Sequence, residues 1–106
     1  MSTPRESKVE KTVSLYAEKL GMDQFKFTSP GKRAVPDRIF FFGVSTLLLE
    51  FKKKGEKPTP LQRNLLIKLQ RKGTLVTWTD SMEEGIEIVH AFSKGLYFNS
   101  HYPIDR

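Results

Sequence analysis

Two carboxylates and a lysine stand at the ends of apolar segments in the first half of the sequence. Asp37 begins the run DRIFFF, and Glu50 and Lys52 lie at the end of the run TLLLEFK. Charge is costly to bury at such positions unless it is paired or binds a metal ion. Carboxylate oxygens suit Mg²⁺ or Mn²⁺, and a lysine beside the ion could orient or deprotonate a water molecule. These residue types therefore suit the hydrolysis of a phosphodiester bond.

The two apolar runs are expected to form a β-hairpin that brings these charges together. Gly43 could be the first central residue of a type II′ turn with Val44. Position 42 then pairs with 45, and the same register places Asp37 directly opposite Glu50. Directly opposed Cβ atoms lie about 4.5–5.5 Å apart, so two carboxylates would repel each other there unless a cation lay between them. Lys52 is two residues beyond Glu50 and points to the same face of the strand.

Hydrophobic spacing and capping residues predict the remaining elements. They are a helix at 4–20, a short strand at 25–27, a helix capped by Thr59 and Gln62 and ended by Gly73, a strand at 74–79 and a helix at 80–95. Because a helix connects the strand of Glu50 to the strand at 74–79, these two strands should be parallel. The expected fold is α/β, a mixed central sheet flanked by helices in the order αβββαβα. Residues 1–95 would form one domain, and 96–106 an aromatic tail that packs on it or takes part in a dimer.

The composition favours a nucleic acid partner. Eighteen Lys and Arg against twelve Asp and Glu give a formal net charge of +6, and a basic surface favours a polyanion. A protein that is merely basic has the same composition. The sequence contains no cysteine, which excludes thiol chemistry and predicts a cytoplasmic location. No apolar run is long enough to span a bilayer, and no secretory signal is expected at the N-terminus.

The joint pattern resembles the VRR-NUC domain of the PD-(D/E)XK nuclease superfamily, which has a restriction-endonuclease-like fold. The segments ESKVE, SPGKRA, VPD, EFK and PTPLQ have the order and spacing of that domain from Glu6 to about Phe92. The resemblance is strongest to short, stand-alone members from phages and bacteria. Where the family often has Gly, this chain has Ala34, and Ala permits the same backbone only at negative φ. We therefore expect a slightly altered loop there.

The resemblance implies a role for each matching residue. Asp37 and Glu50 would be the main metal ligands, with the Phe51 carbonyl as a third. Lys52 would be the catalytic lysine, and Gln62 would lie near the phosphate or the metal. The capping role of Gln62 is an equally ordinary explanation of its place.

A glutamate on the first helix would complete the metal site. The VRR-NUC spacing favours Glu6, whereas the related archaeal-type Holliday-junction resolvases would favour Glu10. Residues four apart share a helix face, so both are kept as candidates.

The implied activity is that of a Mg²⁺- or Mn²⁺-dependent, structure-selective DNA endonuclease resembling Holliday-junction resolvases. A four-way junction needs two cuts, which suits a homodimer, and the apolar tail from Leu96 to Tyr102 is a candidate interface. The candidates for contacts to the DNA backbone are the cations Lys32, Arg33, Lys53, Lys54, Lys57 and Arg63, followed by Lys68, Arg71 and Lys72. The protein would work in the cytoplasm of a bacterial or phage-infected cell.

Two other functions remain open from the sequence. A non-catalytic DNA- or RNA-binding module on a nuclease-like fold would have the same basic charge. A basic α/β domain that binds protein would carry the motif by chance. The intact pair of carboxylates and the lysine favour the nuclease over both.

Overall fold

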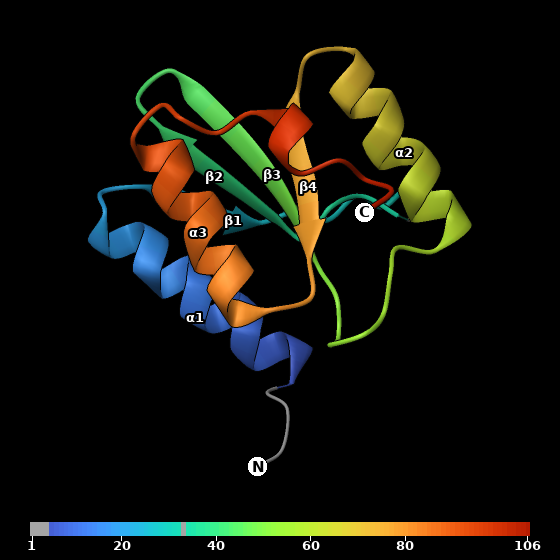
Figure 1. Ribbon diagram of the computed structural model, residues 1–106, viewed down its shortest axis with the longest axis horizontal. Helices are drawn as coiled ribbons and strands as arrows, with labels where there is room; N and C mark the ends of the chain where they lie inside the picture. Colours follow the sequence, from blue (N-terminus) through green and yellow to red (C-terminus); the bar gives the residue numbers. More distant parts are fainter. Residues whose placement is uncertain (1–4, 33) are drawn as a thin grey trace.

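The computed structural model describes residues 5–32 and 34–106, which form one mixed sheet with helices on both faces (Figure 1). The predicted fold class and element order are confirmed. The elements are α1 (Glu6–Lys19), β1 (Asp23–Lys26), β2 (Arg38–Phe42), β3 (Ser45–Phe51), α2 (Pro60–Arg71), β4 (Leu75–Thr79), α3 (Met82–Ser93) and a short 3₁₀ helix, η1 (Asn99–His101). None of the helices in these ranges is long and apolar enough to cross a membrane.

The four strands lie in the order β1-β2-β3-β4. Both β1–β2 and β2–β3 are antiparallel, whereas β3 and β4 run parallel, as the helix between them predicts. The first strand spans 23–26, two residues earlier than its predicted start, because Asp23 is already opposite Phe41 of β2.

Side chains alternate between two apolar cores, one on each face of the sheet. Leu47 and Leu49 of β3 pack in the core covered by α1 and α3, whereas Leu48 packs with Leu66 of α2 and Trp78 of β4. Figure 1 shows α1 and α3 together on one face and α2 on the other. The alternation puts Glu50 on the α2 face, which explains how a residue of α2 can reach it.

The predicted hairpin register is observed. Phe42 pairs with Ser45, and the pairing continues to Arg38 opposite Leu49, so Asp37 and Glu50 are the next opposed positions. Gly43 has a φ of 60°, the left-handed conformation that the first central residue of a type II′ turn requires.

The helix caps also follow the predicted chemistry. Thr59 Oγ1 accepts from the Gln62 backbone N–H, and Gln62 Oε1 accepts from the Thr59 backbone N–H, which completes a capping box. At α3, Ser81 accepts from the backbone N–H of Glu84. The Glu84 carboxylate does not complete a capping box there, because it accepts from the Arg106 guanidinium at 2.7 Å.

The C-terminal segment covers the open edge of β4. Asn99 Oδ1 accepts from the Val76 N–H at 3.1 Å, and the Arg106 guanidinium donates to the Trp78 carbonyl. The guanidinium also lies over the Trp78 ring, 4.6 Å from its centroid. Tyr97 and Tyr102 stack within the core. An uncovered edge strand would expose unpaired backbone groups, and this segment satisfies several of them.

Candidate active site

Asp37 is fixed at the point where β2 begins. Its Oδ2 accepts from the Phe51 backbone N–H at 2.8 Å, and its backbone carbonyl accepts from the Phe27 N–H at 2.8 Å. The side chain is therefore tied to the end of β3, and the main chain continues the ladder of β1. The hairpin register alone places Asp37 near Glu50, and these two bonds fix it there.

Glu50 is almost fully buried, with 3% of its surface exposed. Its Oε2 accepts from Gln62 Nε2 at 3.1 Å and lies 3.8 Å from Lys52 Nζ. The Lys52 side chain is itself 11% exposed, and its backbone N–H donates to the Thr79 carbonyl at 2.8 Å. The structure thus brings together Asp37, Glu50, Lys52 and Gln62, all at one end of the sheet.

The electrostatics of the carboxylate pair favour a bound cation. The pKa of Glu50 rises from an ordinary 4.5 to about 8, chiefly through burial and then through the negative charge of Asp37, against the opposing effect of Lys52. Burial also raises the pKa of Asp37, while the hydrogen bond from Phe51 lowers it. A buried and a half-buried carboxylate that are costly to ionise together gain most from a divalent ion between them.

The donor set fits Mg²⁺ or Mn²⁺ in number and in kind. Within the residues that the structure describes, no three side chains of His, Cys, Asp or Glu are grouped closely enough to hold a metal ion. Mg²⁺ commonly takes only one or two carboxylates and completes its shell with water and substrate phosphate. Asp37 and Glu50 supply two such carboxylates, and the backbone of Phe51 lies next to both.

The two glutamates of α1 have different surroundings. Glu10 is buried, and its Oε2 lies 2.6 Å from Arg38 Nε and 3.5 Å from Lys26 Nζ. Glu6 is half-buried, and its pKa is raised by burial and then by the charge of Asp37. Glu10 is thus paired with cations of the sheet. The negative charges of both glutamates raise the pKa of Glu50, and that of Glu10 also raises the pKa of Asp37, so the ion pairs of Glu10 are what distinguish the two residues.

Arg38 is a residue that the motif did not reveal. It follows Asp37, but strand alternation turns it to the opposite face, where it bonds Glu10 and donates to Gln24 Oε1 at 2.7 Å. Asp80 is a second such residue, because its Oδ2 accepts from the Gly55 N–H at 3.0 Å and so anchors the loop after Lys52. The alternation predicted which way Arg38 points, but its partner on α1 depends on how the helix docks.

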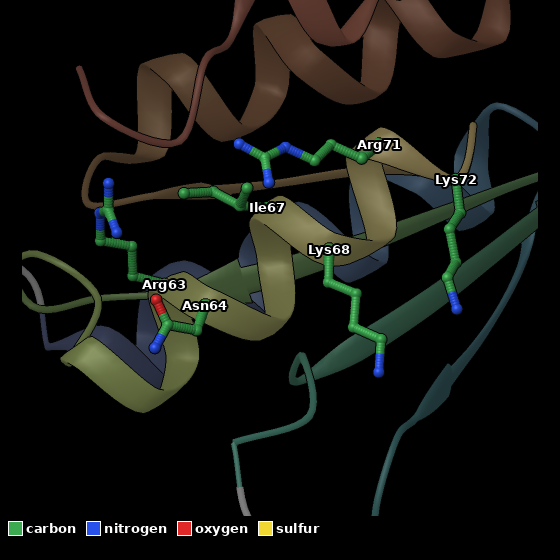
Figure 2. A pocket seen from close by; sticks show the side chains of 6 residues that line it. All are labelled: Arg63, Asn64, Ile67, Lys68, Arg71 and Lys72. Carbon is green, nitrogen blue, oxygen red and sulfur yellow. The ribbon is translucent and has the colours of Figure 1, made fainter.

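The predicted cations lie on several elements and differ in whether they are paired. Arg63 is held by Asp105 in two hydrogen bonds of 2.5 and 2.6 Å, and Lys54 lies 4.0 Å from Asp80. Arg33 lies outside the described residues. The exposed cations among the predicted set are Lys32, Lys53, Lys54, Lys57, Arg63, Lys68, Arg71 and Lys72. The last three share one surface of α2 (Figure 2).

The expectation of negative φ at Ala34 is wrong. Its φ is 71°, so the chain keeps the left-handed backbone that Gly adopts without strain. Pro36 is fully buried two residues later, and the Asp37 carbonyl accepts from the N–H of Phe27, the residue that follows β1. These anchors fix the entry into β2, and Ala34 takes the strain.

Comparisons with known proteins bear on the family and the fold. No protein-family model matches the chain. The chain is 38% identical over 80 residues to "Putative nuclease p44" of Acyrthosiphon pisum secondary endosymbiont phage 1, a match that spans 74% of this chain and 86% of the phage protein. A solved VRR_NUC domain superposes with a TM-score of 0.75 at 21% identity, covering 82% of this chain and 96% of that one. The expected likeness to the VRR-NUC fold is confirmed.

Proposed function

The chain belongs to the family of this phage nuclease and has the VRR-NUC fold, and from this premise we propose that it is a Mg²⁺- or Mn²⁺-dependent DNA endonuclease. One observation carries the proposal. The carboxylate of Glu50 is buried opposite Asp37, with Lys52 Nζ at 3.8 Å and Gln62 Nε2 at 3.1 Å. If the motif had arisen by chance, these four side chains would not be expected to lie together in the fold.

Each residue has a distinct part in phosphodiester hydrolysis. Asp37, Glu50 and the Phe51 carbonyl would hold the ion, which when bound would acidify a water molecule and neutralise phosphate charge. Gln62 fixes the orientation of the Glu50 carboxylate through Oε2. Lys52 Nζ carries the positive charge nearest to this carboxylate, where it would orient the attacking water and stabilise charge on the phosphate in the transition state.

In this proposal Glu6 is the glutamate of α1 that completes the site. Its carboxylate would have to move toward the ion, because no three such side chains are grouped closely enough in the described part of the chain. Glu10 already has two cationic partners, Arg38 and Lys26, so its use as a metal ligand would leave the partly buried Arg38 without its carboxylate. Glu6 has a raised pKa to which Asp37 contributes, which supports a place beside the ion.

The substrate would be branched DNA, with a four-way junction first among candidates. A two-fold homodimer would present two matched active sites to such a junction. Tyr97 and Tyr102 are buried within the chain, so the tail leaves Leu96 and Phe98 for a dimer contact, and Phe25 and Phe41 form a second exposed apolar pair. A DNA nuclease would work in the cytoplasm of a bacterial or phage-infected cell.

A gel assay tests the proposal directly. Labelled four-way junction, fork, flap and linear duplex are incubated with Mg²⁺ or Mn²⁺ and either the wild type or Lys52→Ala. We expect paired, symmetric cuts in the junction that disappear in Lys52→Ala, while binding in Ca²⁺ or EDTA is retained. The control variant Lys53→Ala alters the neighbouring exposed lysine and should still cut.

The other outcomes of this assay separate the alternatives. Preferred cutting of flaps, forks or linear duplex would support a nuclease but contradict the assignment as a junction resolvase. Salt-sensitive binding without metal-dependent cutting of any substrate would favour a non-catalytic DNA- or RNA-binding module. Negligible, salt-insensitive binding would favour a protein-binding domain.

A further inference from the structure

The second helix differs from the other two in charge. The sequence has no Asp or Glu between Lys57 and Thr79, a stretch that contains all of α2. By contrast, α1 and α3 carry three glutamates each. A helix that has basic residues and no acidic residues of its own contributes a local positive field.

The surface around α2 is hollowed, and neighbouring hollows share lining residues. A hollow of about 400 Å³ is lined by Arg63, Asn64, Ile67, Lys68, Arg71 and Lys72 (Figure 2). A second, of about 150 Å³, shares Arg63 with it, and a third, of about 200 Å³, shares Asn64 and Lys68. Asp105 is the one carboxylate residue among all their lining residues, and it already binds Arg63.

Three of these cations are available to an external anion. Lys68, Arg71 and Lys72 are exposed, and in the part of the chain that the structure describes none of the three forms an ion pair. Figure 2 shows the three side chains extending from the helix. We call them, together with Arg63 and Asn64, the α2 basic face.

We propose that the α2 basic face binds the sugar-phosphate backbone of a double-stranded DNA arm that leads away from the active site. The face begins at Arg63, one residue after Gln62, whose amide reaches Glu50. From Arg63 to Lys72 the helix rises by about 14 Å, at about 1.5 Å per residue, or about four base-pair steps of duplex DNA. This assignment extends the proposed function, but the binding itself does not depend on cleavage.

The lining chemistry favours a duplex over a single strand. Proteins that bind single strands stack the bases on aromatic side chains, and none of the residues lining the three hollows is aromatic. The face offers instead guanidinium and ammonium groups and the Asn64 amide, which are donors suited to phosphate oxygens. Contacts of this kind position a duplex without reading its sequence.

A matched pair of triple variants tests the proposal. The first is Lys68→Gln, Arg71→Gln and Lys72→Gln on the α2 basic face. The second is Lys11→Gln, Lys19→Gln and Lys94→Gln on α1 and at the end of α3, where all three lysines are exposed. Both remove the same charge from the full chain. Fluorescence anisotropy with a labelled duplex of about 20 base pairs, in EDTA and across a salt series, gives the affinity and its salt dependence.

We expect the first variant to bind duplex at least about tenfold more weakly at low salt. Its plot of log K against log salt should flatten by up to about 2.7, or about 0.9 for each phosphate that is no longer neutralised. The control should keep the wild-type slope, and both variants should keep the wild-type melting temperature within a few degrees. Equal weakening in the two variants, or none in the first, would overturn the proposal, as would a larger effect on single-stranded DNA than on duplex.

Failure of this inference can be told apart from failure of the nuclease assignment. If the wild type cuts DNA with a divalent metal while the two triple variants bind alike, the nuclease assignment is supported and the DNA-binding role of the α2 basic face is wrong. If the slopes differ as expected but no substrate is cut, the α2 basic face binds DNA as proposed and the nuclease assignment is wrong.

Discussion

The amide of Gln62 joins the buried carboxylate of Glu50 to the first turn of α2. Its nitrogen donates to Glu50 Oε2 at 3.1 Å, and its oxygen accepts from the Thr59 N–H at 2.9 Å. Gln62 therefore caps α2 and at the same time contacts the buried carboxylate of the proposed active site. The start of α2 and the orientation of Glu50 are mechanically linked.

This link predicts that two variants at the start of α2 will differ in cleavage rate. Thr59→Ala removes the N-cap oxygen at a cost of about 1 kcal/mol and leaves the amide of Gln62 near Glu50. Gln62→Ala removes both bonds of the amide. We expect both variants to unfold at lower denaturant concentration, but only Gln62→Ala to lose cleavage rate at a temperature where both are folded. Equal cleavage by the two variants would argue that Gln62 only caps the helix.

The burial of Glu50 predicts an unusual dependence of stability on pH in metal-free protein. Its pKa is raised in the fold to about 8 from 4.5, so the folded state favours the protonated form. The favourable contribution is complete below about pH 4.5 and is lost as the pH rises through 8. Denaturant unfolding in EDTA should therefore show falling stability over this range, and Glu50→Gln should flatten the fall. The same slope in wild type and variant would contradict this assignment.

A divalent metal should reverse that trend. Metal binding requires deprotonated ligands, so the rise in melting temperature caused by Mn²⁺ should grow with pH over the range in which Glu50 ionises. Asp37→Asn should reduce this rise, because it removes one of the two main carboxylate ligands, whereas Glu83→Gln on the exposed surface of α3 should not. A metal-induced shift that survives in Asp37→Asn would place the ion elsewhere.

Much of the site could be predicted because short-range rules determine it. A two-residue turn at Gly43 sets the hairpin register, and strand alternation then puts Glu50 and Lys52 on one face. The cap of α2 follows from the spacing of Thr59 and Gln62. Each of these rules operates within a few residues, so nothing distant needed to be known.

The features that could not be predicted depend on distant contacts. The C-terminal tail is placed by Trp78 and Val76, more than twenty residues earlier, whose backbone groups it satisfies at the edge of β4. The pairing of Glu10 with Arg38 requires α1 to dock on β2, which neither segment specifies alone. Periodicity gives the face of an element but not the partner on that face.

The different surroundings of Glu6 and Glu10 predict different defects. Glu10→Gln should lower stability by about 1–3 kcal/mol, because it leaves the partly buried Arg38 without a charged partner. Replacing Glu10 and Arg38 together with Met should recover much of this stability, since no unpaired charge remains. Glu6→Gln should change stability little but weaken the Mn²⁺-induced shift and the cleavage rate. If Glu10→Gln instead abolished the metal shift without loss of stability, Glu10 would be the ligand.

The strained backbone at Ala34 predicts that glycine will be the better residue there. A non-glycine residue at a φ of 71° pays about 1–2 kcal/mol for its Cβ, and glycine recovers most of this while losing about 0.4–1 kcal/mol through the greater freedom of the unfolded chain. We expect Ala34→Gly to raise the free energy of unfolding by about 0.5–1 kcal/mol, measured by denaturant titration. Gly31→Ala is the matched control in the same loop, because a Cβ there meets no atom within 4 Å and its φ is not positive. That change should be neutral or slightly stabilising, so a loss of stability in Ala34→Gly beside a neutral Gly31→Ala would mean that the Ala34 side chain makes contacts that outweigh its strain.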